Sequence, residues 1–183
     1  MSFLKKLLNH IGGNATPLVS DADLELCAPV SGTLIPIDEV PDPVISERIA
    51  GDGCAFIPEN DCMLSPCDGV ICRLLSSNTA FVVRASCGTE IYVRFGIGSD
   101  NFQGKGFTSL KKIGDPVKKG EKVIAIDLEQ CSDLLKSTVT SMIAIKSSSD
   151  IERVASVGGK VQAGSTPCMW VFLKTKENAN TLA

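Results

Sequence analysis

The chain has 183 residues, a net charge of −3 and a hydrophobic fraction of 44%, which suits one globular domain with a sizeable core. The acidic balance argues against a nucleic-acid binder that depends on phosphate contacts. No uncharged apolar run has the length of a membrane span. The single histidine, His10, excludes a histidine-rich metal centre and any chemistry that needs two histidines. A cleavable signal is not expected, because Lys5 and Lys6 interrupt the first apolar residues.

The cysteine pattern favours reduced thiols over disulfides or metal ligands. The chain has eight cysteines but no Cys-x-x-Cys pair, so neither a thioredoxin-type motif nor a zinc ribbon is expected. Most of them stand among apolar residues, as Cys72 does after Ile71, which predicts buried thiols that act as small hydrophobes. A regulatory or metal-linked cysteine remains the alternative.

The N-terminal segment, residues 2–11, has apolar residues at helical spacing and predicts a short amphipathic helix. A helix of this length is marginal in water, so it needs a surface to fold against, and an anionic membrane would supply one. We therefore expect three parts: an arm and linker at 1–22, a β domain at 23–174 and a flexible tail at 175–183. The residues assigned to the membrane arm are Phe3, Leu4, Lys5, Lys6, Leu7, Leu8 and Ile11.

From Leu24 onward the sequence predicts β structure. Short runs rich in Val, Ile and Thr alternate with Gly, Pro and Asp turn signals, a pattern typical of an antiparallel β-sandwich or barrel. Two short helices are also expected, one over residues 128–135 and one over 149–154, which begins at a Ser or Asp N-cap. The predicted strands are Glu25–Ala28, Thr33–Ile37, Cys54–Ile57, Gly69–Leu74, Ala80–Ala85, Glu90–Phe95, Lys122–Asp127, Val139–Ile145 and Met169–Leu173.

Two pairs of segments repeat each other faintly. Residues 28–34 and 65–71 both read proline, an apolar residue, a small polar residue, glycine and then a strand. Residues 118–121 and 162–165 form a second pair of turn-like segments. The pattern fits either an internal duplication or the ordinary reuse of turn chemistry in antiparallel proteins.

Seven short motifs stand out along the chain: Asp38–Asp42, Gly51–Ala55, Pro66–Gly69, Asn78–Phe81, Val93–Ile97, Gly104–Phe107 and Lys136–Thr138. In their order and spacing they resemble the glucose-specific enzyme IIA component of the bacterial sugar phosphotransferase system, and the resemblance covers about residues 1–174. It implies an antiparallel β-sandwich without a bound cofactor or metal. It also implies a histidine that takes a phosphoryl group from the carrier HPr and passes it to a IIB domain, supported by a second histidine.

The sequence departs from that pattern at the reacting positions. The resemblance implies that Thr79 stands at the position of the accepting histidine and Arg94 at that of the second histidine. An acidic residue of the family falls on Gly98, and Ser77 keeps a hydroxyl beside the acceptor. A neutral imidazole is both a nucleophile and a good leaving group near neutral pH, whereas a threonine hydroxyl needs a general base. A phosphothreonine, once formed, would be a stable ester.

We therefore interpret the chain as a phosphotransfer-deficient relative that keeps a docking surface and works as a regulatory binding module. The alternative is an active phosphocarrier with an unconventional acceptor, for which Cys72 or Cys87 would be candidates. A further alternative is that Thr79 and Arg94 are ordinary surface substitutions. The predicted docking residues are Asp38, Val40, Asp42, Ile45, Leu75, Phe81, Tyr92, Phe95 and Gly98.

The resemblance implies partners such as sugar permeases, glycerol kinase, adenylate cyclase, a IIB domain and HPr, with HPr binding weakened here. It also implies a cytoplasmic location, at the inner face of the membrane if the arm binds lipid. Other classes fit less well. With a single histidine, the chain lacks the ligands that a zinc peptidase needs. A biotinyl or lipoyl carrier would need different residues around Lys118–Gly120, and Gly104–Phe107 lacks the spacing of a phosphate-binding loop.

Overall fold

The computed structural model describes residues 21–98, 104–131 and 135–174, and strands make up much of this part of the chain. Each of the nine predicted strand segments overlaps an observed strand, which confirms the all-β class with a few short helices. In chain order the elements are β1 (Leu24–Cys27), β2 (Gly32–Pro36), η3 (Ile37–Glu39), α2 (Pro43–Ser46), β3 (Gly51–Pro58), β4 (Cys62–Leu64), β5 (Gly69–Leu74), β6 (Ala80–Arg84), β7 (Glu90–Ile97), β8 (Phe107–Ser109), β9 (Pro116–Val117), β10 (Lys122–Ile126), α3 (Leu128–Cys131), β11 (Ser137–Ile145), β12 (Ile151–Ser156), β13 (Gly159–Val161) and β14 (Pro167–Leu173).

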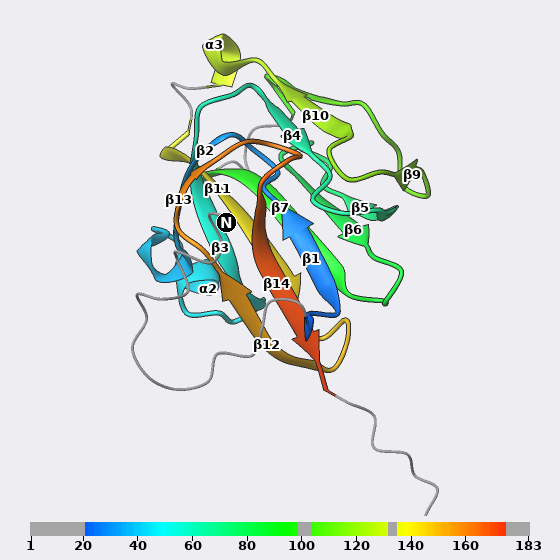
Figure 1. The fold of residues 1–183 in the computed structure, drawn as a ribbon. Helices are drawn as coiled ribbons and strands as arrows, with labels where there is room; N and C mark the ends of the chain where they lie inside the picture. The colour runs from blue at the N-terminus through cyan, green and yellow to red at the C-terminus, as the bar shows by residue number, and fades with distance from the viewer. Residues whose placement is uncertain (1–20, 99–103, 132–134, 175–183) are drawn as a thin grey trace, which may run out of the picture.

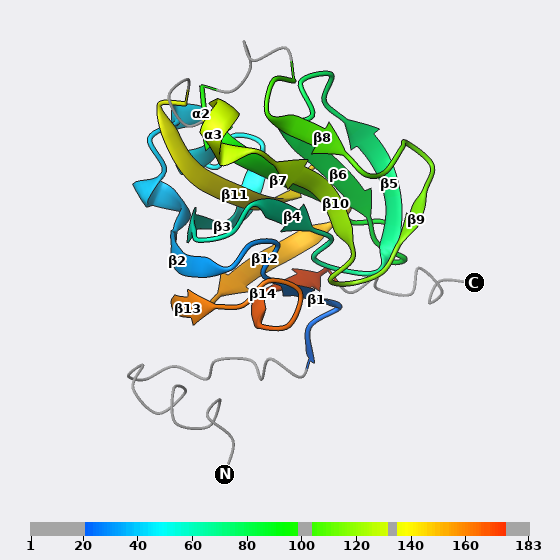
Figure 2. The same cartoon turned by 90° about the horizontal axis from the view of Figure 1, so that it is seen from above.

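The strands form three antiparallel sheets. An eight-stranded sheet has the order β13-β2-β3-β11-β7-β6-β5-β9, and a three-stranded sheet, β1-β14-β12, lies across it (Figure 1). A third sheet, β4-β10-β8, crosses one end of the large sheet, as the view from above shows (Figure 2). The core lies between these sheets, so the molecule is an antiparallel β-sandwich.

Strand alternation decides which side chains enter this core. On β7 the side chains of Ile91, Val93 and Phe95 belong to the main core cluster, whereas Tyr92 and Arg94 point to the opposite face of the sheet. Successive residues of a strand face opposite sides, so a single strand supplies both core and surface. The face that carries Tyr92 and Arg94 is therefore the outer face of the eight-stranded sheet.

A second, smaller core covers part of this outer face. Ile37, Val40 and Ile45, from η3, α2 and the loop between them, pack with Ala55 of β3 and with neighbouring residues of β7 and β11. Asp42 starts α2, because its Oδ1 accepts a hydrogen bond from the Val44 amide at 3.0 Å and a proline follows at the first helical position. The segment from Ile37 to Ser46 is thereby fixed against the sheet.

The helix predicted over residues 149–154 is wrong, since this segment forms strand β12, which pairs with β14. The polar residues before it close a turn instead of capping a helix, and the Ser148 hydroxyl donates to the Ile145 carbonyl. Arg153 then stacks its guanidinium 3.3 Å from the centre of the Phe172 ring. Pairing with β14 thus outweighs the local capping signal.

Other predicted segments are only partly described. The helix expected over 128–135 is present as α3, and residues 132–134 lie outside the described residues. The amphipathic arm from Phe3 to Ile11 and the tail at 175–183 also lie outside them. No helix in the described ranges has the length and apolar character needed to cross a membrane.

The two repeated segments form matching contacts across the middle of the molecule. Each segment hydrogen-bonds to the other at equivalent positions, and each turn-like segment bonds to the segment beside it in the same way. This near-twofold arrangement is what an internal duplication predicts. The matching pairs of bonds are Cys27 N to Pro66 O with Leu64 N to Pro29 O, Gly120 N to Ser65 O with Gly164 N to Ala28 O, and Lys119 N to Asp68 Oδ1 with Ala163 N to Ser31 Oγ.

The two turns meet at a pair of glycines. A Cβ atom placed on Gly164 would lie 2.8 Å from the Gly120 Cα, closer than real carbon atoms approach. Both glycines also have positive φ angles, +80° at Gly120 and +71° at Gly164. The contact between the turns therefore depends on the absence of a side chain.

Candidate functional site

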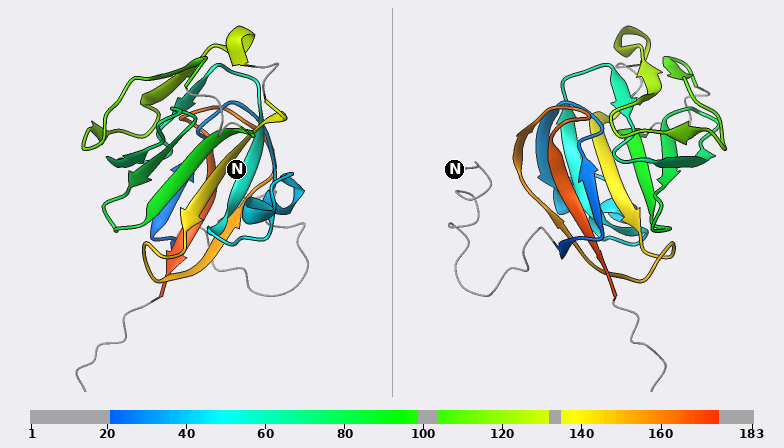
Figure 3. Two further views of the ribbon diagram at one scale, coloured as in Figure 1. Left: turned by 180° about the vertical axis from the view of Figure 1, so that it is seen from behind. Right: turned by 45° about the vertical axis from the view of Figure 1, so that its right-hand side comes forward.

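A depression of about 570 Å³ opens on the outer face of the large sheet, beside α2. The view from behind looks onto this face, where α2 lies next to β3, β11 and β7 (Figure 3, left). Its residues come from α2 and the loop after it, from three strands and from the turn after β11. The lining is Asp42, Val44, Ile45, Ile49, Ala50, Arg73, Tyr92, Arg94, Ile143, Ile145, Lys146 and Ser147.

Arg94 lies in this depression and is held in the middle of the sheet. Its backbone pairs with Ala80 of β6 on one side and with Ser141 of β11 on the other. Only 9% of the residue is exposed, and its Nη1 lies 3.7 Å from Oδ2 of Asp42. Asp42 thus caps α2 with one carboxylate oxygen and forms an ion pair with Arg94 through the other.

Thr79 lies next to this point but deeper in the protein. Its carbonyl accepts a hydrogen bond from the Phe95 amide at 2.9 Å, which places its backbone beside that of Arg94 on the neighbouring strand. The residue is 0% exposed, and its hydroxyl lies 2.8 Å from that of Ser77. The structure therefore brings the two substituted positions together, one buried and one facing the depression.

The predicted docking residues divide into surface and core. Asp38 is exposed, and Asp42 and Tyr92 are half-buried at the depression. Leu75 and Gly98 are half-buried and do not line the depression. Ile45 lines the depression, although only 4% of the residue is exposed. The surface assignment of Val40, Phe81 and Phe95 is corrected by their burial, since strand alternation and the second core turn all three side chains inward. Phe95 packs edge-on against Phe107, with ring centres 5.8 Å apart.

Several residues of the depression were not predicted from the sequence, among them Ile49, Arg73 and Lys146. Ile49 is 53% exposed and, with Val44 at 52%, forms an apolar rim. Arg73 and Lys146 add positive charge from β5 and from the turn after β11. Ordinary strand and turn patterns contain such residues, so only the pairing of strands distant in sequence could have identified them.

Glu90 organises the charges at the edge of this site. Its carboxylate accepts hydrogen bonds from Arg84 at 2.7 Å and from Arg73, and its side chain is 12% exposed. The hydrogen bond from Arg84 is the main cause that lowers the pKa of Glu90 below its ordinary value of 4.5. Glu90 therefore stays ionised and holds two arginines on the sheet surface.

This arrangement predicts an acid-sensitive contribution to stability. Because folding lowers the pKa of Glu90, its contribution is complete above pH 4.5 and is lost as the pH falls through the lower, folded value. We expect Glu90→Gln to lower the free energy of unfolding by about 1 kcal/mol at pH 7. Urea unfolding between pH 7 and pH 3 should show a shallower pH dependence than in the wild type. Glu129→Gln, a change at an exposed residue, is the control. If the free energy of unfolding depends on pH equally in the wild type and in Glu90→Gln, Glu90 is not the source of the acid-sensitive stability.

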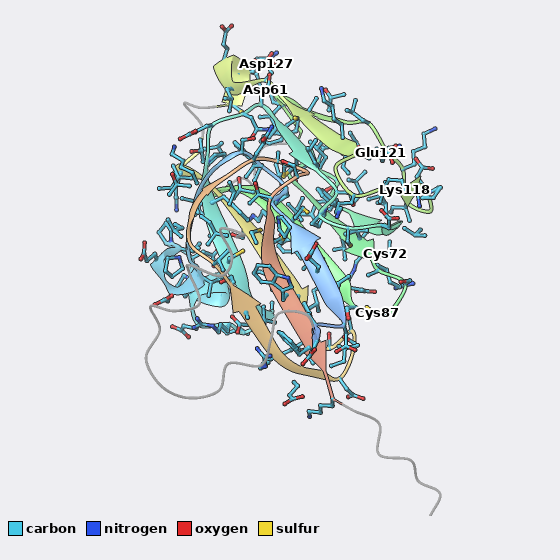
Figure 4. All side chains as sticks on the ribbon, viewed as in Figure 1. Asp61, Cys72, Cys87, Lys118, Glu121 and Asp127 are labelled. Atoms are coloured by element: carbon cyan, nitrogen blue, oxygen red, sulfur yellow. The ribbon has the colours of Figure 1, made fainter. Side chains whose placement is uncertain are left out.

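The cysteines do not supply an alternative nucleophile at the depression. All eight are unpaired thiols, and burial raises the pKa of Cys67 to about 12. Burial also raises the pKa of Cys72, whose thiol contacts the Val82 carbonyl at 3.5 Å. Cys72 on β5 and Cys87 in the β6–β7 turn both lie outside the lining of the depression (Figure 4).

The lysines of the β9–β10 hairpin are engaged in local contacts. Asp68 accepts hydrogen bonds from the Lys119 amide and from Lys118 Nζ, at 2.8 and 2.9 Å, and these two bonds lower its pKa. Glu121 of the same hairpin binds the Lys118 amide and Lys111 (Figure 4). Such fixed contacts argue against a carrier-type lysine. In the described ranges no three His, Cys, Asp or Glu side chains gather into a metal site.

Comparisons with known proteins agree on one family. Residues 24–150 match the model of the phosphoenolpyruvate-dependent sugar phosphotransferase system, EIIA 1. The chain is 39% identical over 144 residues to the PTS system glucose-specific EIIA component of Borreliella burgdorferi, covering 79% of this chain and 76% of that protein. The component of Haemophilus influenzae is 36% identical, with 79% and 86% covered. Glucose permease IIA from Mycoplasma capricolum superposes with a TM-score of 0.73 at 28% identity, over 80% of this chain and 94% of the other.

Proposed function

Because the chain belongs to the EIIA 1 family of the phosphoenolpyruvate-dependent sugar phosphotransferase system, as a glucose-type component, we propose that it acts there as a regulatory binding module without phosphotransfer. The observation that carries the proposal is that the neighbouring positions 79 and 94, of which the second lines the depression, hold threonine and arginine. The described part of the chain contains no histidine, since the only one is His10.

The surroundings of these residues support the loss of transfer. The Thr79 hydroxyl is buried and bonded to Ser77, which is no base near neutral pH. A guanidinium, unlike an imidazole, offers no free nitrogen lone pair, so Arg94 cannot attack phosphorus or take up a proton. The burial of Thr79 also favours position 94 over position 79 as the place where a phosphoryl group would be exchanged, which reverses the roles implied by the resemblance.

Phosphorylation by the purified system tests the proposal. The protein is incubated with phosphoenolpyruvate, enzyme I and HPr, and the intact masses of both HPr and this protein are measured. We expect HPr to gain one phosphate, as the internal control, and this protein to keep its mass. An acid-labile gain of one phosphate on this protein would favour the alternative function, an active phosphocarrier with an unconventional acceptor.

Family membership implies partners among the proteins of the sugar phosphotransferase system, and we propose that HPr binds weakly. The resemblance implies a basic docking surface on HPr, which Asp38, Glu39 and Asp42 would attract. Arg94 sets a fixed positive charge beside them, and Gly98 replaces a carboxylate. Like charges brought together in an interface cost several kcal/mol. Partners that dock on the apolar rim formed by Val44 and Ile49 would be less affected.

Titration calorimetry at low salt measures this effect. We expect the double variant Arg94→His, Gly98→Asp to bind unphosphorylated HPr at least tenfold more tightly than the wild type, about 1.4 kcal/mol. Gly98 has a φ of +77°, which aspartate tolerates better than most residues, and the added Cβ meets only the flexible Lys136 side chain. Lys118→Gln, on the distant hairpin, is the control. Equal affinities for wild type and double variant would show that the charge change is irrelevant.

We further propose a cytoplasmic protein whose N-terminal arm binds the inner face of the membrane. The spacing of Phe3, Leu4, Leu7, Leu8 and Ile11 in the sequence would place them on one side of a helix, and each of Lys5 and Lys6 would add about 1 kcal/mol near an anionic surface. We expect the full chain to sediment with anionic vesicles, and Lys5→Gln with Lys6→Gln to weaken binding about 10- to 30-fold. Lys118→Gln with Lys119→Gln should change vesicle binding little. Unchanged binding by the variant at Lys5 and Lys6 would refute the proposal that the arm binds the membrane.

A further inference from the structure

The three-stranded sheet β1-β14-β12 has an outer face that no described helix or strand covers. Figure 1 looks onto this face, and the view from behind shows the depression on the other side of the sandwich (Figure 3, left). Two aromatic residues of β14 point to the outer face, because Met169 and Val171 belong to the main core cluster while Trp170 and Phe172 alternate with them. Aromatic side chains in such a position are exposed unless a further segment covers them.

Trp170 is nevertheless only 3% exposed. Its neighbours across the strands are Glu25 of β1 and Ala155 of β12, which lie on the same face of the sheet. Glu25 is itself exposed, and Ala155 has only a methyl group, so these two neighbours leave most of an indole ring open. The burial of Trp170 therefore points to a covering segment from outside this sheet.

Two nitrogen donors on this face have no hydrogen-bond partner among the described residues. They are Nε1 of Trp170 and Nη2 of Arg153, and both atoms are buried. Arg153 lies on the outer face, since its guanidinium stacks 3.3 Å from the centre of the Phe172 ring. Buried donors are nearly always paired, so a covering segment that brings oxygen acceptors would be stabilised here.

The N-terminal segment starts at the border of this face. The Asp23 amide donates to the Val171 carbonyl at 3.1 Å, and the Leu173 amide donates to Asp23 Oδ2 at 2.7 Å. The chain before Asp23 therefore begins beside the two β14 residues that flank Phe172. Residues 12–20 connect it to the predicted arm, and a connection of this length spans up to about 30 Å. Strands lie about 4.8 Å apart, so the arm can reach every strand of this sheet.

The composition of the arm matches this face. Its apolar residues, which the sequence predicts on one side of a helix, suit the two aromatic rings. Lys5 and Lys6 are complementary in charge to the exposed Glu25. Main-chain carbonyls of a docked segment can accept hydrogen bonds from the two unpaired donors. Because the arm is tethered beside the face, its effective concentration there is roughly millimolar, so weak contacts suffice to hold it.

We propose that residues 1–20 fold back over the outer face of the β1-β14-β12 sheet and place the apolar residues of the arm against Trp170. The arm is then covered when it is not on a membrane. Docking on the sheet competes with membrane binding, because both use the same apolar residues. This competition rests on the proposed membrane binding, whereas the docking itself depends neither on it nor on the loss of phosphotransfer.

Fluorescence of Trp170, the only tryptophan of the chain, tests the docking. We expect the full-length variant Leu4→Ser, Leu7→Ser, Leu8→Ser to be quenched by acrylamide about threefold more strongly than the wild type, since release of the arm opens the indole to the quencher. Leu110→Ser with Ile113→Ser, at two exposed residues after β8, is the matched control and should leave quenching unchanged. Equal quenching of wild type and arm variant would overturn the inference. Wild-type quenching that falls as protein concentration rises would also overturn it, because a second copy would then be the cover.

Vesicles test the competition. Vesicles of phosphatidylglycerol and phosphatidylcholine should raise the quenching of wild-type Trp170, whereas vesicles of phosphatidylcholine alone should not. Ala155→Gln places a larger polar side chain beside Trp170, so it should weaken docking and tighten binding to the anionic vesicles about threefold. Unchanged vesicle affinity in Ala155→Gln would refute the competition, and stronger protection of Trp170 on the vesicles would identify the membrane as the cover and overturn the inference.

The two assays also separate this inference from the proposed membrane binding. If the wild type binds no vesicles but the arm variant is still quenched more strongly than the wild type, the docking is supported and only the membrane proposal fails. If the wild type binds anionic vesicles and the arm variant shows the same quenching as the wild type, only the docking fails.

Discussion

Replacing Thr79 and Arg94 together with histidine is expected to produce a protein that accepts a phosphoryl group from HPr. Thr79 lies directly before β6 and Arg94 on β7, and the Thr79 carbonyl accepts a hydrogen bond from the Phe95 amide, so two imidazoles at these positions would be neighbours. An imidazole supplies the nucleophile, and a second one shares its proton, which neither threonine nor arginine does. Intact-mass measurement with phosphoenolpyruvate, enzyme I and HPr should show one acid-labile phosphate.

The single variants measure the need for each histidine. We expect Thr79→His alone to be phosphorylated at least 100-fold more slowly than the double variant, because Arg94 cannot exchange a proton. Arg94→His alone should be faster than Thr79→His, since position 94 faces the depression while Thr79 is buried. Full transfer in Thr79→His would refute both points. Circular dichroism and urea unfolding show whether each variant keeps the fold.

Gly164→Ala is expected to lower the free energy of unfolding by about 2–5 kcal/mol. One part of this cost comes from the positive φ of +71°, which disfavours any residue with a Cβ. The other part comes from the Gly120 Cα, which would lie 2.8 Å from the new methyl carbon. Because the new Cβ would meet a backbone atom of the other turn, the turns themselves must separate to relieve the clash.

Two other glycines separate these causes. Gly88 has a φ of +90° with nothing within 4 Å of the position that a methyl carbon would occupy, so Gly88→Ala should cost only about 1–2 kcal/mol. Gly158→Ala lacks both the positive φ and the contact, and it should be nearly neutral. Chemical denaturation of the three variants gives the comparison. If Gly164→Ala lowers the free energy of unfolding no more than Gly88→Ala does, the close contact between the two turns does not add to the cost of the substitution.

The strands were predictable because their signal is local. Alternating apolar residues, as in β6 and β7, mark one face of a strand whatever its neighbours are. The helix prediction for residues 149–154 was wrong because the capping signal is local, whereas the pairing of this segment with β14 involves residues distant in sequence. Strand β3 was predicted to begin at Cys54 rather than Gly51, since Gly51 and Gly53 resemble turn residues although they lie within a strand beside β11. The very short β4, β8, β9 and β13 carry too few residues for any period.

The site was predictable where it depended on single substitutions. Thr79, Arg94 and Asp42 were identified from the sequence and lie together in the structure. The depth of each residue was not predictable, because burial depends on what covers a strand. The segment from Ile37 to Ser46 covers part of the outer face, so Val40 is core while Val44, four residues later, is exposed. Arg73 and Lys146 reach the depression only through strand order.

The two ends of the eight-stranded sheet also limit how the molecule associates. At one end, β9 has two residues, and its proline has no amide hydrogen to offer a neighbouring strand. At the other, β13 has three residues, and Lys160 at its centre forms an ion pair with Glu59. Short, charged or proline-containing borders discourage a second chain from extending a sheet. Growth into fibrous aggregates by strand addition is therefore disfavoured at both borders of this sheet.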